Sequence, residues 1–223
     1  LLLMSNGTAV SASLFKSLPF DTVKDFAPVS TLGFFDIALV TKADSPFKTL
    51  ADLLSFAKAN PGKLNVGTIN IGSTQNLAAE LFKSTAGINI QIVPFNGTPA
   101  VITALRGGQI DAAVEILGPV KTQIDAKAIH ALAVMGLKRA PSMPNIPTAK
   151  ESGVANMNAA SWNALAVSAK TPKDIVAKLN AATSTALASA DVKKKLADLG
   201  VEADASSPEL LGELLNAEIK RWG

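Results

Sequence analysis

Apolar and polar positions alternate along the middle of the chain in a rhythm typical of α/β proteins. Short apolar runs, which predict strands, are separated by stretches whose apolar residues recur every three or four positions, which predicts helices. Between residues 49 and 135 the expected strands cover residues 64–68, 90–94, 110–114 and 128–134, each preceded by a helix. Strands that alternate with helices are usually joined by right-handed crossovers, so this part of the chain predicts a parallel sheet.

The two ends of the chain lack this alternation. The N-terminal end predicts a strand at residues 1–4, a polar loop at 5–8, an irregular segment at 11–32 and a strand at 34–41. After a proline-containing connection at 138–159, a strand is expected from Ser161 to Ala169, followed by helices with only a short strand at 201–203 among them. These helices need a sheet to cover, and the N-terminal segment is the only candidate.

The chain is therefore expected to form two lobes with a ligand cleft between them, closing around a hinge. Lobe 1 would comprise residues 1–40 and 164–223, and lobe 2 residues 41–163. Residues 1–4 are apolar without a charged segment before them or a cleavage site after them, so a signal peptide is not predicted there. We interpret them as the end of a strand whose beginning is missing, which predicts a fold truncated at its N-terminus.

The segment 63–82 predicts a binding site, because a strand is followed there by a polar turn and a helix. Ser73 or Thr74 is the expected N-cap, Gly72 gives the turn conformational freedom, and Gln75 adds an amide. Free N–H groups and the helix dipole would make this helix start an anion pocket. The turn has no Lys or Arg and is not a Walker loop, so a small carboxylate fits better than a nucleotide. The alternative is an ordinary strand–turn–helix joint.

Composition argues against several other functions. The 223 residues are 48% hydrophobic and 17% charged with a formal net charge of +3, and they include no Cys and no Tyr. The absence of Cys removes disulfides, thiolate nucleophiles and cysteine-ligated metal clusters, so neither a metal nor a cofactor is expected. Scattered basic residues and few aromatic ones argue against nucleic-acid binding. No apolar run approaches the roughly 20 residues of a membrane span.

Enzyme chemistry is poorly supported by the sequence. His130 is the only histidine and lies in an apolar run, so we expect a core or strand-end residue rather than a catalytic one. No Ser–His–acid set and no nucleophile elbow are recognisable. The chain is therefore predicted not to be an enzyme.

Several motifs keep one order along the whole chain. They are the loop 5–8, the segment 19–29, Gly72–Thr74 with Leu77–Phe82, Val93–Gly97, Gly107–Asp111, Leu132–Val134 with Pro144–Thr148, and Ser161 with Trp162. Together they resemble the Bug (TctC-like) solute-binding proteins of tripartite tricarboxylate transport systems. The resemblance implies an α/β, type II periplasmic binding protein fold in the periplasm. It also implies membrane permease subunits as partners and a carboxylate ligand, which would be a di- or tricarboxylate, an acidic amino acid or an aromatic acid. We expect a monomer.

Two departures from the family pattern are visible. The family's signal peptide and its first βα unit, with a ligand-contacting loop, are absent from this sequence. Glu115 stands where the family often has Asp. That difference either favours a ligand with an amino group or marks an exposed strand end.

The expected ligand contacts come from both lobes. They are Ser5, Asn6 and Thr8 from lobe 1, Asn70, Gly72, Ser73, Thr74 and Gln75 from lobe 2, and Asn96 and Glu115 at the rim. Trp162 is either a wall of the cleft or a core residue beside the hinge. The alternative function is the effector-binding domain of a transcription regulator, which uses a similar two-lobed architecture.

Overall fold

The chain divides into two compact units. The computed structural model describes all residues from 1 to 223. Unit 1 comprises Leu1–Phe35 and Ser161–Gly223, and unit 2 comprises Asp36–Ala160. We expected the divisions after residues 40 and 163. The chain leaves unit 1 inside the strand β2 (Phe26–Lys42) and returns at the start of β7 (Ala160–Ser168). A division inside a continuous strand has no turn residue to mark it in the sequence.

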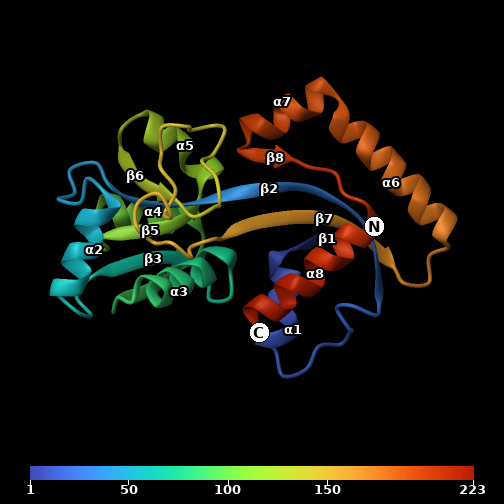
Figure 1. Cartoon of the computed structure of the whole chain (residues 1–223), viewed down its shortest axis with the longest axis horizontal. Coiled ribbons are helices and arrows are strands. Elements are labelled where there is room, and N and C mark those ends of the chain that lie inside the picture. Colours follow the sequence, from blue (N-terminus) through green and yellow to red (C-terminus); the bar gives the residue numbers. More distant parts are fainter. The chain divides into compact units, whose positions relative to one another are not determined.

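Unit 2 contains the predicted alternation of strands and helices (Figure 1). Its elements are α2 (Leu50–Ala59), β3 (Asn65–Ile69), α3 (Thr74–Ala86), β4 (Gln91–Phe95), α4 (Thr98–Arg106), β5 (Ala112–Ile116), α5 (Leu117–Asp125) and β6 (Ile129–Val134). β3 pairs in parallel with β4 and β5, as predicted. The sheet is not parallel throughout, however, because β2 pairs antiparallel with both β5 and β6.

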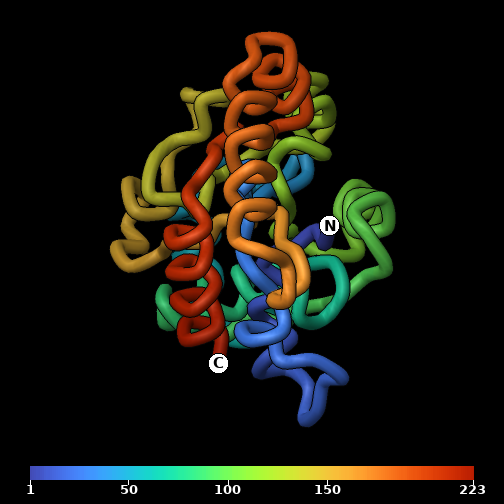
Figure 2. Tube along the Cα trace, turned by 90° about the vertical axis from the view of Figure 1, so that its right-hand side faces the viewer, coloured from blue at the N-terminus to red at the C-terminus, as the bar shows by residue number.

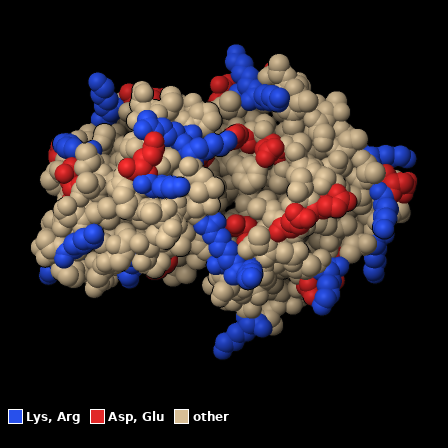
Figure 3. Space-filling model, viewed as in Figure 1, with Lys and Arg blue, Asp and Glu red and all other residues tan.

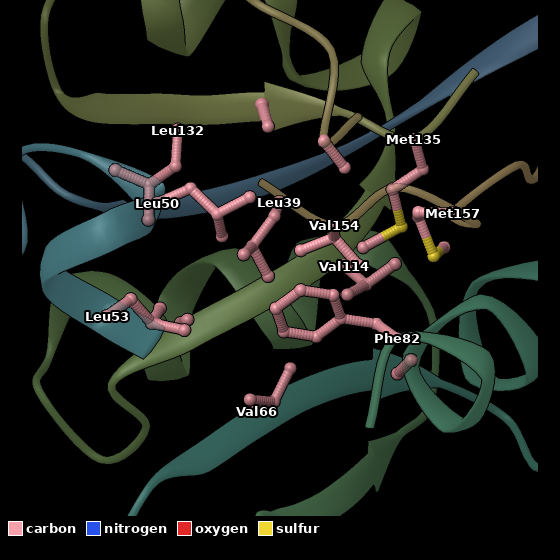
Figure 4. Packing of buried hydrophobic residues seen from close by; sticks show 14 of the residues in the cluster. Leu39, Leu50, Leu53, Val66, Phe82, Val114, Leu132, Met135, Val154 and Met157 are labelled. Atoms are coloured by element: carbon pink, nitrogen blue, oxygen red, sulfur yellow. The ribbon is translucent and has the colours of Figure 1, made fainter. Parts of the chain in front are cut away.

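Unit 2 has an apolar core on each face of its sheet. Neighbouring residues of β2 point to opposite faces, so Leu39 belongs to one core and Val40 to the other. α2 and α3 cover the first face, and Figure 4 shows Leu50, Leu53 and Phe82 pointing into its core. α4 and α5 cover the second face. Each large side chain buried in this way contributes about 1.5–3 kcal/mol, so the two cores hold the helix starts firmly against the sheet.

The connection 138–159 has no helix or extended strand, as predicted, and makes one isolated bridge between Val134 and Thr148. It nevertheless contributes buried side chains to both cores, including Ile146, Val154 and Met157. The connection is thus a packed part of unit 2.

Unit 1 is built from both ends of the chain, which are dark blue at the N-terminus and orange to red at the C-terminus in the trace of Figure 2. Its elements are β1 (Leu2–Ser5), α1 (Asn6–Leu14), β7, α6 (Lys173–Ala188), α7 (Ala190–Asp198), β8 (Val201–Ala203), α8 (Pro208–Trp222) and the first part of β2. β1 pairs antiparallel with β7, and β8 pairs antiparallel with β2. Trp162 and Met4 lie with Leu211 and Leu215 in its core.

Two predictions for unit 1 were wrong. Residues 6–8 are not a loop but the start of α1, and much of the segment predicted as irregular belongs to α1 and β2. α1 is made of small and polar residues with little helical periodicity in its hydrophobicity, so the pattern does not reveal it. β2 contains buried Ser30 and Thr31, whose polarity hides the strand, and Ser206 hydrogen-bonds to both residues.

None of the helices is both long enough and apolar enough to cross a bilayer. On the face shown in Figure 3, Lys and Arg side chains are interspersed with Asp and Glu side chains and form no stripe of one sign.

Candidate functional site

The start of α3 forms the centre of the candidate site in unit 2. Ser73 is the N-cap, which confirms one of the two predicted alternatives. Its Oγ accepts a hydrogen bond of 3.1 Å from the Asn76 N–H. Gly72 has φ +81°, which a residue with a Cβ rarely adopts. The first turn of α3 contains no acidic residue. The positive end of the helix dipole therefore has no carboxylate of its own turn to neutralise it.

Asn76 holds this turn in place. Its Oδ1 accepts a hydrogen bond of 3.2 Å from the Gly72 N–H, and its Nδ2 donates to Thr68 Oγ1 at 3.2 Å. Sequence reasoning missed Asn76, although its position three residues after the N-cap, where a capping box places its second side chain, was a usable signal. The side chain fixes the turn to the end of β3.

Glu115 lies at the same edge of the sheet, because β3 and β5 run in parallel. It is fully buried inside β5, so the expectation of a rim position and the alternative of an exposed strand end were both wrong. Its Oε2 accepts hydrogen bonds from Thr98 Oγ1 at 2.9 Å and from Gln75 Nε2 at 3.5 Å. Its Oε1 has no hydrogen-bond partner within the protein. Gln75 and Thr98 belong to the first turns of α3 and α4, so Glu115 joins two helix starts.

Burial raises the pKa of Glu115 above its usual value. The hydrogen bonds from Thr98 and Gln75 act in the opposite direction but do not offset the burial. Thr98 was missed as a contact residue, although it stands in the polar turn that contains Asn96 and Gly97.

The remaining predicted residues of unit 2 are placed around this centre. Thr74 is buried as the first residue of α3. Asn70 is exposed, and its carbonyl oxygen accepts a hydrogen bond from the Ser73 N–H. Asn96 is exposed directly after β4. Gly72, Ser73, Thr74 and Gln75 thus share one edge of the sheet with Glu115, while Asn70 and Asn96 belong to the turns that follow β3 and β4.

The predicted residues of unit 1 cluster where β1 ends. Ser5 precedes α1, and its N–H donates to Thr8 Oγ1 at 3.1 Å. Asn6 is buried as the first residue of α1. Trp162 precedes Asn163, the β7 residue that pairs with Ser5. It is 1% exposed and belongs to the core of unit 1, which confirms the core alternative predicted for it. Its indole N–H has no hydrogen-bond partner within the protein.

His130 is exposed near the start of β6, so of the two expected positions the core is excluded and the strand end is confirmed. It is the second residue of β6, and its Nε2 lies 3.0 Å from the Lys48 carbonyl oxygen. A cavity of about 600 Å³ adjoins it, lined by residues of α2 and the segment before it, of α5 and β6, and of the connection 138–159.

The sequence pattern that defines the tripartite tricarboxylate transporter family receptor matches residues 1–223. The chain belongs to this receptor family. Its members are receptors rather than enzymes. The resemblance to Bug proteins is confirmed by the protein BugT of Bordetella pertussis, which is 30% identical over 99% of this chain and 69% of its own length.

Members of this receptor family with known structures share the fold. The Rhodopseudomonas palustris protein Rpa4515, solved with adipate, superposes with a TM-score of 0.89 at 31% identity, covering 99% of this chain and 74% of its own. MatC from the same organism, solved with malate, gives 0.84 at 31% identity, covering 99% of this chain and 76% of its own. The type II periplasmic binding protein fold is thereby confirmed.

The chain spans about two thirds of the length of two of its curated relatives. It spans 66% of the length of a protein from Pseudomonas sp. (strain P51), with 31% identity over the whole of this chain. It spans 65% of an Agrobacterium vitis relative, with 33% identity.

Proposed function

We propose that this chain is an extracytoplasmic solute-binding protein that captures a small carboxylate for a tripartite tricarboxylate-type transporter. The observation that carries the proposal is the start of α3, where Ser73, Gly72 and Gln75 surround the positive end of a helix that has no acidic residue in its first turn. An anion at such a point receives backbone hydrogen bonds and a favourable dipole together. The adipate and malate complexes of two similar receptors agree with a dicarboxylate.

The chemistry of the site favours a carboxylate over a phosphate ester. The turn 70–73 and the first turn of α3 contain no Lys or Arg, so the available donors are neutral. Neutral donors suit a small, singly charged group, whereas nucleotide phosphates usually also require a cationic side chain. Glu115 at the same edge would further oppose a multiply charged phosphate.

The proposal extends to unit 1 and to the cellular setting. Ser5, Asn6, Thr8 and Trp162 are the proposed contacts from unit 1, and Asn70, Thr74 and Asn96 complete the set from unit 2. The protein would act in the periplasm as a monomer and deliver its ligand to membrane permease subunits. Membership in a receptor family favours this function over the effector-binding domain of a transcription regulator.

Calorimetric titration with malate and adipate tests the proposal. We expect the variant carrying Ser73→Ala and Thr74→Ala to lose about 1–3 kcal/mol of binding free energy, the scale of lost hydrogen bonds to a charged group. The matched control is Thr49→Ala, which removes the N-cap of α2. It should cost about 1 kcal/mol of stability and leave the affinity unchanged. Equal affinities of the double variant and the wild type would show that the start of α3 does not bind the ligand.

A further inference from the structure

The side chain of Glu115 raises a chemical question that a simple anion site does not answer. A bound carboxylate at the start of α3 would lie beside a second carboxylate, that of Glu115, which Gln75 ties to the same helix turn. Two like charges at one buried point repel each other strongly, and the usual result in proteins is that the pair keeps one proton.

We propose, on the basis of the proposed function, that Glu115 binds the ligand as a neutral carboxylic acid whose Oε1–H donates a hydrogen bond to the ligand carboxylate. Glu115 would thus select carboxylate ligands by a shared proton. The proton comes from solvent and binds Oε1 as the ligand enters, so that of the two carboxyl groups that meet there only the ligand's is charged.

The geometry of the two carboxylate oxygens supports this assignment. Oε2 already accepts hydrogen bonds from Thr98 and Gln75, so a proton on that oxygen would displace a donor. Oε1 is fully buried and has no partner within the protein. Buried polar atoms are almost always hydrogen-bonded, so an unpartnered oxygen at a ligand site indicates an interaction made with the ligand. Only Oε1 is available to carry the shared proton.

The surroundings of Glu115 favour a neutral acid facing one carboxylate over two alternatives, a ligand ammonium group and a pair of ionised carboxylates. The starts of α3 and α4 present positive dipole ends to this point, which opposes a ligand ammonium group there. The same dipoles and the neutral donors Gln75 and Thr98 can stabilise a single anion, but the first turns of α3 and α4 contain no Lys or Arg that could balance a second one. Burial already raises the pKa of Glu115 before any ligand is present, so the protonated state is within reach.

The ionisable residues on the elements around Glu115 lie away from the first turns of the helices. Asp36 of β2 lies on the same face of the sheet, two residues from Ala38, which pairs with Glu115. The ionisable residues of α3, α4 and α5, all beyond the first turns of their helices, are Glu80, Lys83, Arg106, Lys121 and Asp125. A second variant, Asp36→Asn, therefore separates the titration of Glu115 from that of the ionisable β2 residue nearest to it in the strand register.

Titration of the full chain with malate and with adipate at pH 6–8.5 tests the shared proton. We expect Kd to rise with pH by up to about tenfold per unit, because the ligand carboxylates are ionised throughout this range. Titrations in buffers of different ionisation enthalpy should show uptake approaching one proton. Glu115→Gln mimics the neutral acid, so it should bind with near the low-pH affinity of the wild type, without pH dependence and without proton uptake. Asp36→Asn should keep the wild-type pH profile.

Three outcomes would overturn the inference. The first is wild-type binding that does not change with pH, in which case the effect of Ser73→Ala with Thr74→Ala would still support the proposed function. The second is a loss of affinity of more than tenfold in Glu115→Gln together with a preference for aspartate over malate, which would identify Glu115 as the partner of an ammonium group. The third is binding of neither malate nor adipate by the wild type, which would overturn the proposed function as well.

Discussion

Two helix starts in unit 2 are built alike but differ in charge, because only the first turn of α2 contains a carboxylate. α2 begins after the N-cap Thr49, and Asp52 stands three residues later. α3 begins after the N-cap Ser73, and Asn76 stands three residues later. In α2 the carboxylate of Asp52 accepts hydrogen bonds from the N–H groups of Thr49 at 2.8 Å and Lys48 at 3.1 Å. In α3 the corresponding side chain is a neutral amide that accepts from the Gly72 N–H.

The difference shows what makes a helix start available to a ligand. α2 neutralises its own positive end with Asp52, whose pKa is lowered by the hydrogen bonds it accepts from Thr49. A third turn of this kind occurs outside any helix, where Glu151 accepts from the Thr148 N–H at 2.7 Å and Thr148 Oγ1 accepts from the Glu151 N–H at 3.0 Å. Of these three turns only that of α3 lacks a carboxylate, and it is the one beside Glu115.

The largest expected effect comes from giving α3 the carboxylate of α2. Asn76→Asp replaces the side-chain NH2 group by an oxygen and so places a negative charge at the start of α3. We expect malate and adipate affinity to fall by about 100-fold or more, equivalent to roughly 2.7 kcal/mol, because the new charge repels the ligand. Isothermal calorimetry measures the effect directly.

The matched control is the reverse exchange in α2. Asp52→Asn should lower Tm, because α2 loses the carboxylate of its capping box, and should leave ligand affinity unchanged. If Asn76→Asp bound malate and adipate as tightly as the wild type, the neutral start of α3 would have no role in recognition.

The sequence predicted the local geometry at the start of α3 because the signals for it are local. Ser73 and Gly72 are read from a polar turn between a strand and a helix, and Thr49 with Asp52 from a capping box, and the structure confirms these features. The burial of Glu115 depends instead on which strands are neighbours, since β5 lies between β2 and β3. Residue 115 looked like a strand end because the predicted strand stopped at residue 114, whereas β5 continues to Ile116.

The fold was predictable to a similar extent. Elements with periodic apolar faces, such as α2, were found, whereas α1 was missed because its residues are small and polar. The antiparallel direction of β2 was not predictable either. Strand direction is set by how distant segments pair, and the apolar pattern of a buried strand is the same in both directions.

An intermediate effect is expected from straining the turn before α3. Gly72→Ala forces a side chain into φ +81°, at a cost of about 1–2 kcal/mol. Because the same turn positions the start of α3, we expect ligand affinity to fall by several fold as well. Chemical denaturation and calorimetric titration measure the two effects.

The control acts at the other end of the same helix. Gly87→Ala places a side chain at φ +61° in the C-cap of α3, where a Cβ would meet no atom within 4 Å. It should lower stability by a similar amount without changing affinity. An equal loss of affinity in both variants would show that helix stability, not the geometry of the turn, governs binding.

The smallest effect is expected at the turn formed by Thr148 and Glu151, in which Glu151 has the place that Asp52 has at the start of α2. The hydrogen bonds from Arg139 and the Thr148 N–H lower the pKa of Glu151 from 4.5 to about 2. A carboxylate whose pKa is lowered by folding stabilises the fold fully above its unfolded pKa, and this contribution is lost as pH falls toward the folded value.

We therefore expect the Tm difference between the wild type and Glu151→Gln to stay constant from pH 7 to about 4.5 and to shrink steadily below it. The difference should be small, because the Arg139–Glu151 pair is half exposed on both sides and solvent screens it. Ligand affinity should be the same in both proteins at pH 7, since this turn satisfies its N–H group with its own carboxylate. A Tm difference that grew below pH 4.5 would mean that Glu151 is held mainly in its neutral form, contrary to the hydrogen bonds it accepts.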